Sequence, residues 1–217
     1  MDKIELGEVE HPQYSVIWLH GLGADGNDFA PIIPELNMPS QTHFVFPHAP
    51  YRAVTINGGT PMRAWFDLIS LSESGQVDEK GILESVASVH QLIDAEIAKG
   101  VKSEKIILAG FSQGGSIAIL AGLLYPQRLG GIIGLSTFLA MPHHLDPTNH
   151  QINKSTPIFV GHGSQDPLVA PSLGKRITHF LTEWGNPVSW HEYPMPHSVS
   201  KDEIEDIADW LKENLYN

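Results

Sequence analysis

Short apolar runs alternate with segments of helical periodicity along this chain. Six runs of six residues are rich in apolar side chains and are bounded by polar or turn-forming residues, which is typical of buried strands. They cover 15–20, 43–48, 105–110, 131–136, 157–162 and 188–193, and an edge strand is expected near 4–9. Helices are predicted over 82–99, 113–124, 172–184 and 201–215. Because strands and helices alternate, we predict an α/β fold with a mostly parallel sheet.

Two of the predicted helices carry a single apolar stripe, which indicates packing on the sheet rather than on a partner. In the first, apolar residues recur every three or four positions: Ile82, Val86, Val89, Ile93 and Ile97. The last helix opens with Ser200 and Glu203, which have the spacing of a capping box. No repeat or linker divides the chain. We therefore expect a single domain over residues 1–217, with helices on both faces of the sheet.

One short motif indicates a catalytic serine. The sequence GFSQG, with Ser112 at its centre, joins the strand at 105–110 to the helix at 113–124. A G-x-S-x-G turn between a strand and a helix is the nucleophile elbow of α/β-hydrolases, in which glycines permit a tight turn that exposes the serine hydroxyl. A plain glycine-rich turn is the alternative, but the flanking strand and helix favour the elbow. Ser112 is therefore the predicted nucleophile.

A nucleophilic serine needs a base to remove its proton and an acid to orient that base. In α/β-hydrolases the acid and then the histidine follow the serine, on loops after later strands. Asp166 follows the strand at 157–162, and His197 follows the strand at 188–193. Asp146 is the alternative acid, but its loop is not connected to the strand end that is expected to carry the acid. We predict Asp166 as the acid and His197 as the base.

Three other histidines lie near these positions in the sequence. His179 and His191 fall inside a predicted helix and a predicted strand, and His162 ends the strand before the acid. None of the three is on the loop that the last strand leads to, and we expect His162 to pack against the core or to support the site.

The loop after the first central strand has the composition of an oxyanion loop. Residues 20–26 read HGLGADG, and their glycines let the backbone approach a ligand closely. We predict the backbone N–H of Leu22 as one oxyanion donor and that of Gln113, directly after the nucleophile, as the other. A phosphate-binding loop is the alternative. The chain lacks the lysine of the P-loop motif, and its net charge of −12 is unfavourable for binding phosphate, which argues against it.

The stretch from 50 to 81 interrupts the regular alternation of elements. It contains paired glycines, an apolar segment over 65–71 and a polar run over 72–78. A loop of this length in a compact domain is usually functional, and we interpret 65–76 as a lid or as a wall of the substrate groove. A surface hairpin whose aromatic side chains pack on the core is the alternative.

Composition narrows the range of partners. A net charge of −12 argues against nucleic acid and against electrostatic docking on anionic lipid, although an apolar patch could still insert into a membrane. The chain has no cysteine, which excludes disulfides and thiolate metal sites, and we predict no metal and no cofactor. The first residues do not have the pattern of a signal peptide, and no apolar stretch has the length of a bilayer span. We expect a cytoplasmic protein.

Four segments together resemble the small carboxylesterase and acyl-protein thioesterase family of α/β-hydrolases. They are 20–29 (HGLGADGNDF), 47–50 (PHAP), 64–67 (AWFD) and 110–115 (GFSQGG). The resemblance implies an α/β-hydrolase fold without a large cap domain, no cofactor, and frequent homodimers. It assigns the same triad and the same two oxyanion donors. It also implies an acyl groove bordered by Trp65, Leu68, Ile69 and Leu71.

The chain departs from the family pattern in two places. The family often has serine where this chain has Ala64, and glycine is common shortly before the catalytic histidine, where this chain has Pro194, Met195 and Pro196. The prolines stiffen the histidine loop. Neither difference removes a catalytic group.

We predict a serine hydrolase that cleaves carboxylic esters or thioesters through an acyl-enzyme. Its substrate could be a small acyl ester, a lysophospholipid or an acylated protein, and a transient membrane contact through 65–71 is compatible with this activity. A lysophospholipase with no protein substrate is the nearest alternative. The alternative that is not an enzyme is a catalytically silent hydrolase fold that binds lipid or a partner protein. The intact triad argues against it.

Overall fold

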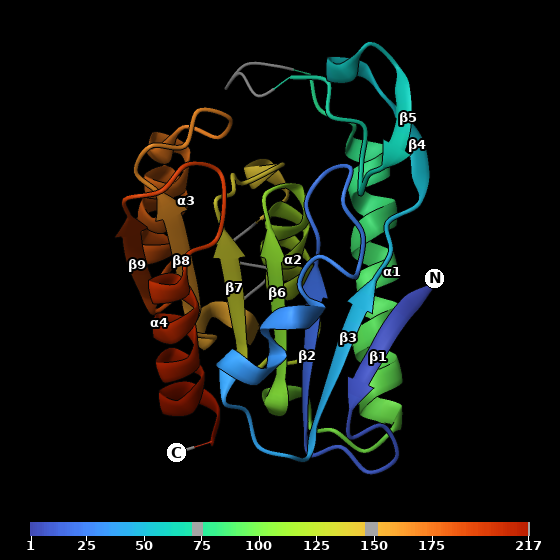
Figure 1. Cartoon of the computed structure of the whole chain (residues 1–217), viewed down its shortest axis with the longest axis vertical. Helices are drawn as coiled ribbons and strands as arrows, with labels where there is room; N and C mark the ends of the chain where they lie inside the picture. The colour runs from blue at the N-terminus through green and yellow to red at the C-terminus, as the bar shows by residue number, and fades with distance from the viewer. Residues whose placement is uncertain (71–75, 146–151, 217) are drawn as a thin grey trace.

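The computed structural model of the chain describes residues 1–70, 76–145 and 152–216. Its centre is a seven-stranded sheet in the order β1-β3-β2-β6-β7-β8-β9 (Figure 1). Strand β1 is antiparallel to β3, and all other neighbours in this sheet pair in parallel. The predicted α/β fold with a mostly parallel sheet is therefore confirmed. The strands are β1 (Lys3–Gly7), β2 (Tyr14–Leu19), β3 (Thr42–Pro47), β6 (Ile106–Phe111), β7 (Gly131–Leu135), β8 (Ile158–Gly163) and β9 (Val188–Tyr193).

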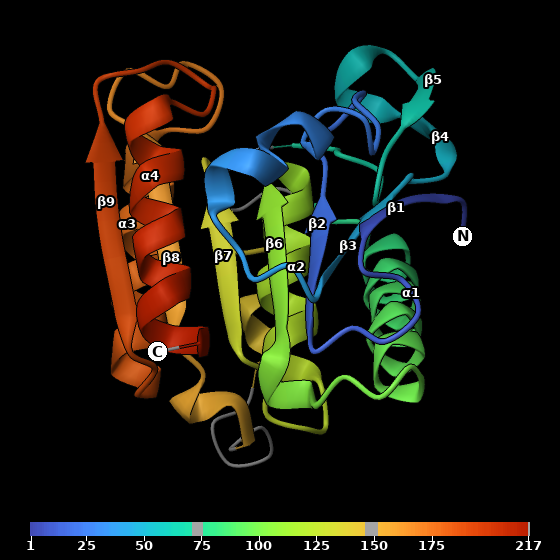
Figure 2. The same cartoon turned by 60° about the horizontal axis from the view of Figure 1, so that its bottom comes forward.

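Helices cover both faces of the sheet (Figures 1 and 2). Helices α1 (Glu79–Ala98), α2 (Gln113–Leu124) and α3 (Pro171–Trp184) pack on one face, and α4 (Lys201–Leu211) packs on the other with the 3-10 helix η1 (Ala30–Leu36). None of the helices in the described ranges has both the length and the apolar character needed to cross a bilayer. Short 3-10 and π segments complete the chain: η2 (Thr55–Asn57), η3 (Ser103–Lys105), η4 (Pro142–His144), η5 (Ile152–Ser155) and η6 (Lys212–Tyr216).

Strands at the centre of the sheet are buried on both faces. In β2, Ile17 and Leu19 join the core under α1, α2 and α3, whereas Val16 and Trp18 join the core under α4. Burial on both faces explains why these strands read as continuous apolar runs rather than as alternating patterns. The sheet is therefore a rigid platform, and the carboxyl ends of its parallel strands lie at one edge.

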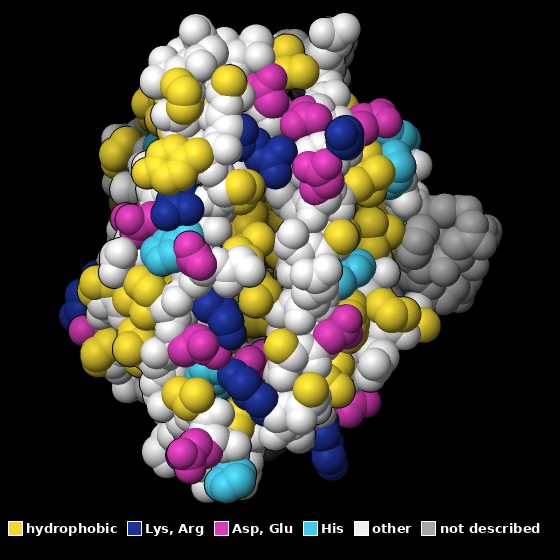
Figure 3. Space-filling view, turned by 90° about the vertical axis from the view of Figure 1, so that its right-hand side faces the viewer, with side chains coloured by type: hydrophobic (Ala, Val, Ile, Leu, Met, Phe, Trp, Pro, Cys, Tyr) yellow, Lys and Arg dark blue, Asp and Glu magenta, His cyan; other side chains and the backbone are white. Residues whose placement is uncertain are grey.

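The segment after β3 forms a two-stranded hairpin of β4 (Tyr51–Val54) and β5 (Thr60–Arg63). The aromatic side chains of Trp65 and Phe66 behind it are buried in the core. The hairpin alternative of the sequence analysis thus describes 51–66. The lid interpretation of 65–76 stays a prediction, and Leu71 lies outside the described residues. The side of the molecule that carries the hairpin and α1 shows hydrophobic side chains among acidic and basic ones (Figure 3).

The start of α4 differs from its prediction. Ser200 caps the helix, because its Oγ accepts a hydrogen bond from the Glu203 N–H at 3.2 Å. The carboxyl of Glu203 does not return to Ser200, so the second half of the predicted capping box is wrong. Instead this side chain is fully buried against Gly161 of β8, where a glycine leaves room for it. Burial without a hydrogen-bond partner in the described chain raises the pKa of Glu203 to about 8.

Candidate active site

Ser112 lies on a sharp turn between β6 and α2. Its backbone has φ 54° and ψ −120°, a conformation that is rare for a residue with a side chain and that is often found at functional sites. The turn is too tight for a side chain behind it, since a Cβ at Gly114 would lie 2.4 Å from the His20 carbonyl oxygen. The Ser112 N–H donates to the Leu135 carbonyl at 2.8 Å, and Thr137 Oγ1 donates to the Ser112 carbonyl at 2.6 Å. These contacts hold the strained turn in place.

The structure brings the three predicted triad side chains together. The Nε2 atom of His197 lies 3.0 Å from Ser112 Oγ, and its Nδ1 atom lies 2.7 Å from Asp166 Oδ2. Because the ionised carboxylate only accepts, Nδ1–H is the donor to Asp166 and Nε2 is free to accept the serine proton. The three groups come from loops after β6, β8 and β9, in the order expected of an α/β-hydrolase.

The carboxylate of Asp166 is held by the turn that follows it. Its side chain is fully buried, and its Oδ1 accepts hydrogen bonds from the N–H groups of Leu168 and Val169, both at 2.9 Å. These bonds stabilise a negative charge that burial alone would disfavour. Oδ2 is left to orient His197.

His162 is hydrogen-bonded to the turn that follows Asp166. Its Nε2–H donates to the Val169 carbonyl at 2.9 Å and lies 3.5 Å from Asp166 Oδ2. Burial lowers the pKa of His162, which favours the neutral ring. The sequence analysis expected a packing or supporting role for His162, and these contacts agree with support of the acid. They do not agree with a second base, because no contact joins His162 to Ser112 in the described chain.

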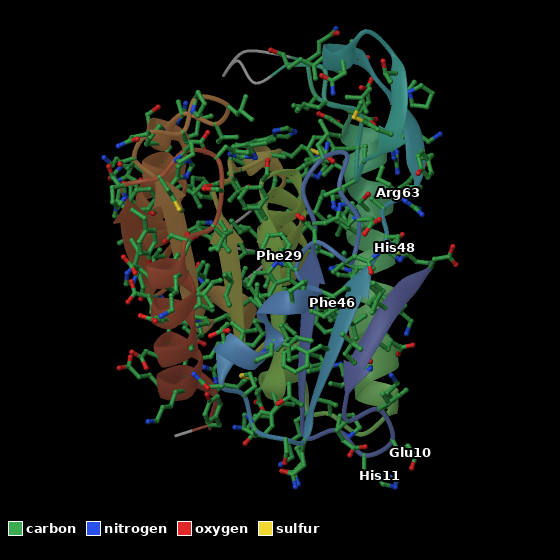
Figure 4. The ribbon with its side chains drawn as sticks, in the orientation of Figure 1. Glu10, His11, Phe29, Phe46, His48 and Arg63 are labelled. Atoms are coloured by element: carbon green, nitrogen blue, oxygen red, sulfur yellow. The ribbon has the colours of Figure 1, made fainter. Side chains whose placement is uncertain are left out.

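Three anchors fix the loop that carries Leu22. The Ala49 N–H donates to Nε2 of His20 at 3.0 Å, so Nδ1–H of the same ring donates to the Gly21 carbonyl at 2.7 Å. Burial lowers the pKa of His20, which favours this neutral form. The Gly23 N–H donates to the Arg63 carbonyl at 2.8 Å. The third anchor is His48, whose Nδ1 accepts from the Gly26 N–H at 3.0 Å; Figure 4 shows His48 and Arg63 beside this loop.

The two predicted oxyanion donors are free to bind a ligand. Within the part of the chain that the structure describes, neither the Leu22 N–H nor the Gln113 N–H donates a hydrogen bond. The Gln113 N–H is also the first of α2, where unpaired amides and the helix dipole attract negative charge. This arrangement can stabilise the oxyanion of a tetrahedral intermediate.

Comparison with known proteins identifies the family of the chain. A sequence profile of the phospholipase/carboxylesterase family matches residues 2–215. The chain belongs to this family. Acyl-protein thioesterase 1 of Saccharomyces cerevisiae is 37% identical over 96% of each chain, and carboxylesterase SOBER1 of Arabidopsis thaliana is 37% identical over 92% of this chain and 90% of that one. The crystal structure of Zea mays acyl-protein thioesterase 2 is 28% identical, with a TM-score of 0.88 over 99% of each chain.

The structure has a cavity of about 460 Å³ whose lining does not include the triad residues. It is formed mainly by residues 138–143, which follow β7, and by one face of α3. Phe138, which lines the cavity, directly follows Thr137, whose hydroxyl donates a hydrogen bond to the Ser112 carbonyl. Its apolar lining includes Val77, Phe138, Leu139, Met141, Leu173, Ile177 and Phe180.

Three of the predicted groove residues lie in the described part of the chain, and none of these three lines the cavity. Trp65 is fully buried and Leu68 is 9% exposed, both within the core, whereas Ile69 is partly exposed. Neighbouring Ser70 does line the cavity. A substrate-binding role for Trp65, Leu68 and Ile69 stays a prediction, as it does for Leu71.

The sequence analysis missed the residues that form most of the cavity. An apolar run over 138–141 directly follows a strand that ends at the catalytic edge, and this position could have marked it. In α3, Leu173, Ile177 and Phe180 recur at helical spacing, which reads equally well as core packing. The sequence pattern alone does not separate these two roles.

Proposed function

We propose that this chain hydrolyses carboxylic esters and thioesters of acyl chains, with Ser112 as its nucleophile. The observation that carries the proposal is the continuous hydrogen-bonded array from Ser112 Oγ through His197 to the buried Asp166 carboxylate. Membership of the phospholipase/carboxylesterase family supports it. The yeast and Arabidopsis relatives are named as an acyl-protein thioesterase and a carboxylesterase, which also supports it.

The reaction follows from the positions of these groups. Ser112 Oγ attacks the acyl carbonyl while its proton passes to His197 Nε2, and Asp166 stabilises the imidazolium that forms. The N–H groups of Leu22 and Gln113 bind the oxyanion. Collapse of the tetrahedral intermediate transfers the proton from His197 to the leaving alcohol or thiol. Water activated by His197 then attacks the acyl-enzyme and releases the acid, so no step requires a cofactor.

The cavity that Phe138 lines is the best place for the acyl chain. Apolar side chains form much of its lining, and one of them, Phe138, directly follows Thr137, which is hydrogen-bonded to the Ser112 carbonyl. A volume of about 460 Å³ is within the range of small-molecule sites. We therefore expect medium or long acyl chains to bind there, whether the leaving group is a small alcohol, the glycerophosphodiester of a lysophospholipid or the cysteine thiol of an acylated protein.

Chain-length profiling tests this activity. Hydrolysis of p-nitrophenyl esters from two to twelve carbons is compared between the wild type and Ser112→Ala. We expect activity to peak on the longer esters and to disappear in the variant. Activity that survives in Ser112→Ala would refute the assignment, and a peak at two to four carbons would refute the acyl-chain role of the cavity.

A second comparison separates the candidate substrates. Release of palmitate from an S-acylated peptide and from a lysophospholipid is measured at matched concentrations. Faster cleavage of the peptide would support an acyl-protein thioesterase, and faster cleavage of the lipid would support the lysophospholipase alternative. No turnover of any ester would favour a catalytically silent binding protein. A cytoplasmic location and a homodimer stay predictions.

A further inference from the structure

Two histidines and a glutamate lie close together, and one of the histidines, His143, lines the cavity. Glu79 is the first residue of α1, and His143 and His144 belong to η4, which follows β7. One ligand atom from each of the three residues lies within 4.8 Å of the others. Glu79 and His143 are exposed and His144 is half-buried, so the cluster is accessible to an ion from solvent.

The spacing within this cluster suits a tetrahedral metal ion. The Glu79 Oε1 atom lies 3.3 Å from Nε2 of His143. Two ligands at the usual Zn–N and Zn–O distances are separated by about 3.4 Å when the coordination is tetrahedral. The rings of His143 and His144 are in contact, with centroids 4.8 Å apart. Zinc binds imidazole nitrogen and carboxylate oxygen readily, and water can supply the fourth ligand.

A second cluster of similar composition differs from the first because lysine side chains already neutralise it. Glu5, His43 and Glu96 also come within 4.8 Å of one another. There, Lys99 lies 3.0 Å from Glu5 and 3.1 Å from Glu96, and Lys3 lies 2.7 Å from Glu5. The ammonium groups already neutralise that site. Glu79, in contrast, forms no salt bridge to lysine or arginine among the residues that the structure describes.

We propose that Glu79, His143 and His144 form a binding site for Zn²⁺ or a similar divalent transition metal ion. Our sequence analysis predicted no metal, and the lack of cysteine excludes thiolate sites but leaves this nitrogen and oxygen set intact. His143 lines the cavity, so a bound ion would tie this part of the lining, after β7, to the start of α1. The ion would therefore slow the hydrolysis of long acyl chains more than that of short ones, an effect that rests on the proposed function.

Calorimetric titration of untagged protein with Zn²⁺, after removal of metal by EDTA, tests the binding. We expect one ion per chain in the wild type, with affinity weakened roughly tenfold or more in each of Glu79→Gln, His143→Ala and His144→Ala, since each removes a ligand. His179→Ala is the matched control. His179 lines the same cavity and pairs with Glu183 at 3.4 Å, but it belongs to no three-residue cluster in the described ranges.

The outcomes are distinct. Binding that is lost in the three ligand variants and kept in His179→Ala supports the site. No stoichiometric binding, or binding that survives any of the three substitutions, overturns it. The effect on catalysis is read separately, as inhibition of twelve-carbon against four-carbon ester hydrolysis with and without Zn²⁺. Bound zinc that inhibits both equally, or neither, would overturn this effect on long acyl chains while leaving Ser112-dependent hydrolysis intact.

Discussion

The side chain of Gln113 is hydrogen-bonded to the backbone on both sides of the Trp65–Phe66 peptide. Its Oε1 accepts from the Trp65 N–H at 2.8 Å, and its Nε2 donates to the Phe66 carbonyl at 2.9 Å. The indole Nε1–H of Trp65 in turn donates to the His20 carbonyl at 2.8 Å. One residue therefore contributes a proposed oxyanion donor through its backbone and connects the elbow, the oxyanion loop and the segment after β5 through its side chain.

Replacement of Gln113 by alanine is expected to destabilise the protein by about 2–4 kcal/mol, because it leaves two buried backbone groups unpaired. The backbone N–H remains, so kcat should fall less than it would on loss of an oxyanion donor. Urea unfolding and ester hydrolysis measure the two effects. Gln127→Ala, at an exposed position, is the control. Stability equal to that of the control would contradict the connecting role of Gln113.

Substitution of His162 tests whether it positions the acid. His162→Phe removes the donor to the Val169 carbonyl and loosens the turn that holds Asp166. We expect kcat to fall roughly tenfold, about 1.4 kcal/mol of barrier, with KM little changed. His162→Gln can place a donor near the position of Nε2 and should recover most of the loss. A Phe variant with normal kcat, or a Gln variant no better than Phe, would exclude positioning through this donor.

The buried Glu203 gives a stability difference that depends on pH. The folded chain keeps a proton on this carboxyl up to about pH 8, whereas the unfolded chain loses it near pH 4.5. The stability that the protonated carboxyl contributes is therefore present below about pH 4.5 and is lost as pH rises to 8. Glu203→Gln cannot lose a proton, so its advantage in unfolding free energy should grow by about 1.4 kcal/mol per pH unit between about 5 and 8.

Chemical denaturation of both proteins at several pH values measures this difference. It should level off above pH 8, where the carboxyl is ionised in both states. A difference that does not change with pH would mean that Glu203 is ionised in the folded protein at neutral pH.

Filling the cavity tests its role in binding the acyl chain. Leu173→Trp adds bulk to a half-buried position of the lining. We expect kcat/KM for a twelve-carbon ester to fall roughly tenfold or more, with less than about a twofold change for a four-carbon ester. Leu83→Trp, on the exposed side of α1, should change neither. Equal losses on both esters in Leu173→Trp would place the acyl chain elsewhere.

Sequence reasoning reached the fold and the positions of the triad groups because each is encoded locally. The central strands are continuous apolar runs, and Ser112, Asp166 and His197 lie on the turn or loops that follow β6, β8 and β9. The carboxyl ends of parallel strands meet at one edge, so the chain order alone places these residues close together. Their roles in catalysis stay proposals.

Features that depend on contacts between segments far apart in the sequence could not be predicted from local sequence patterns. Glu203 has the spacing of a helix cap, but its side chain turns inward because β8 has a glycine at 161 opposite it. The apolar lining of the cavity has the same helical periodicity as a core face. The hairpin over 51–63 has little apolar alternation and was recognised only as an alternative to a lid.

Labelling with a fluorophosphonate tests the central claim most directly, because this probe reacts with serines activated by a neighbouring base. The wild type is labelled at pH 7 and mapped by peptide mass spectrometry, with Ser112→Ala and His197→Ala in parallel. Our account predicts a single adduct on Ser112, absent from Ser112→Ala and formed far more slowly in His197→Ala. An adduct on another residue, or equal labelling of the wild type and His197→Ala, would contradict it.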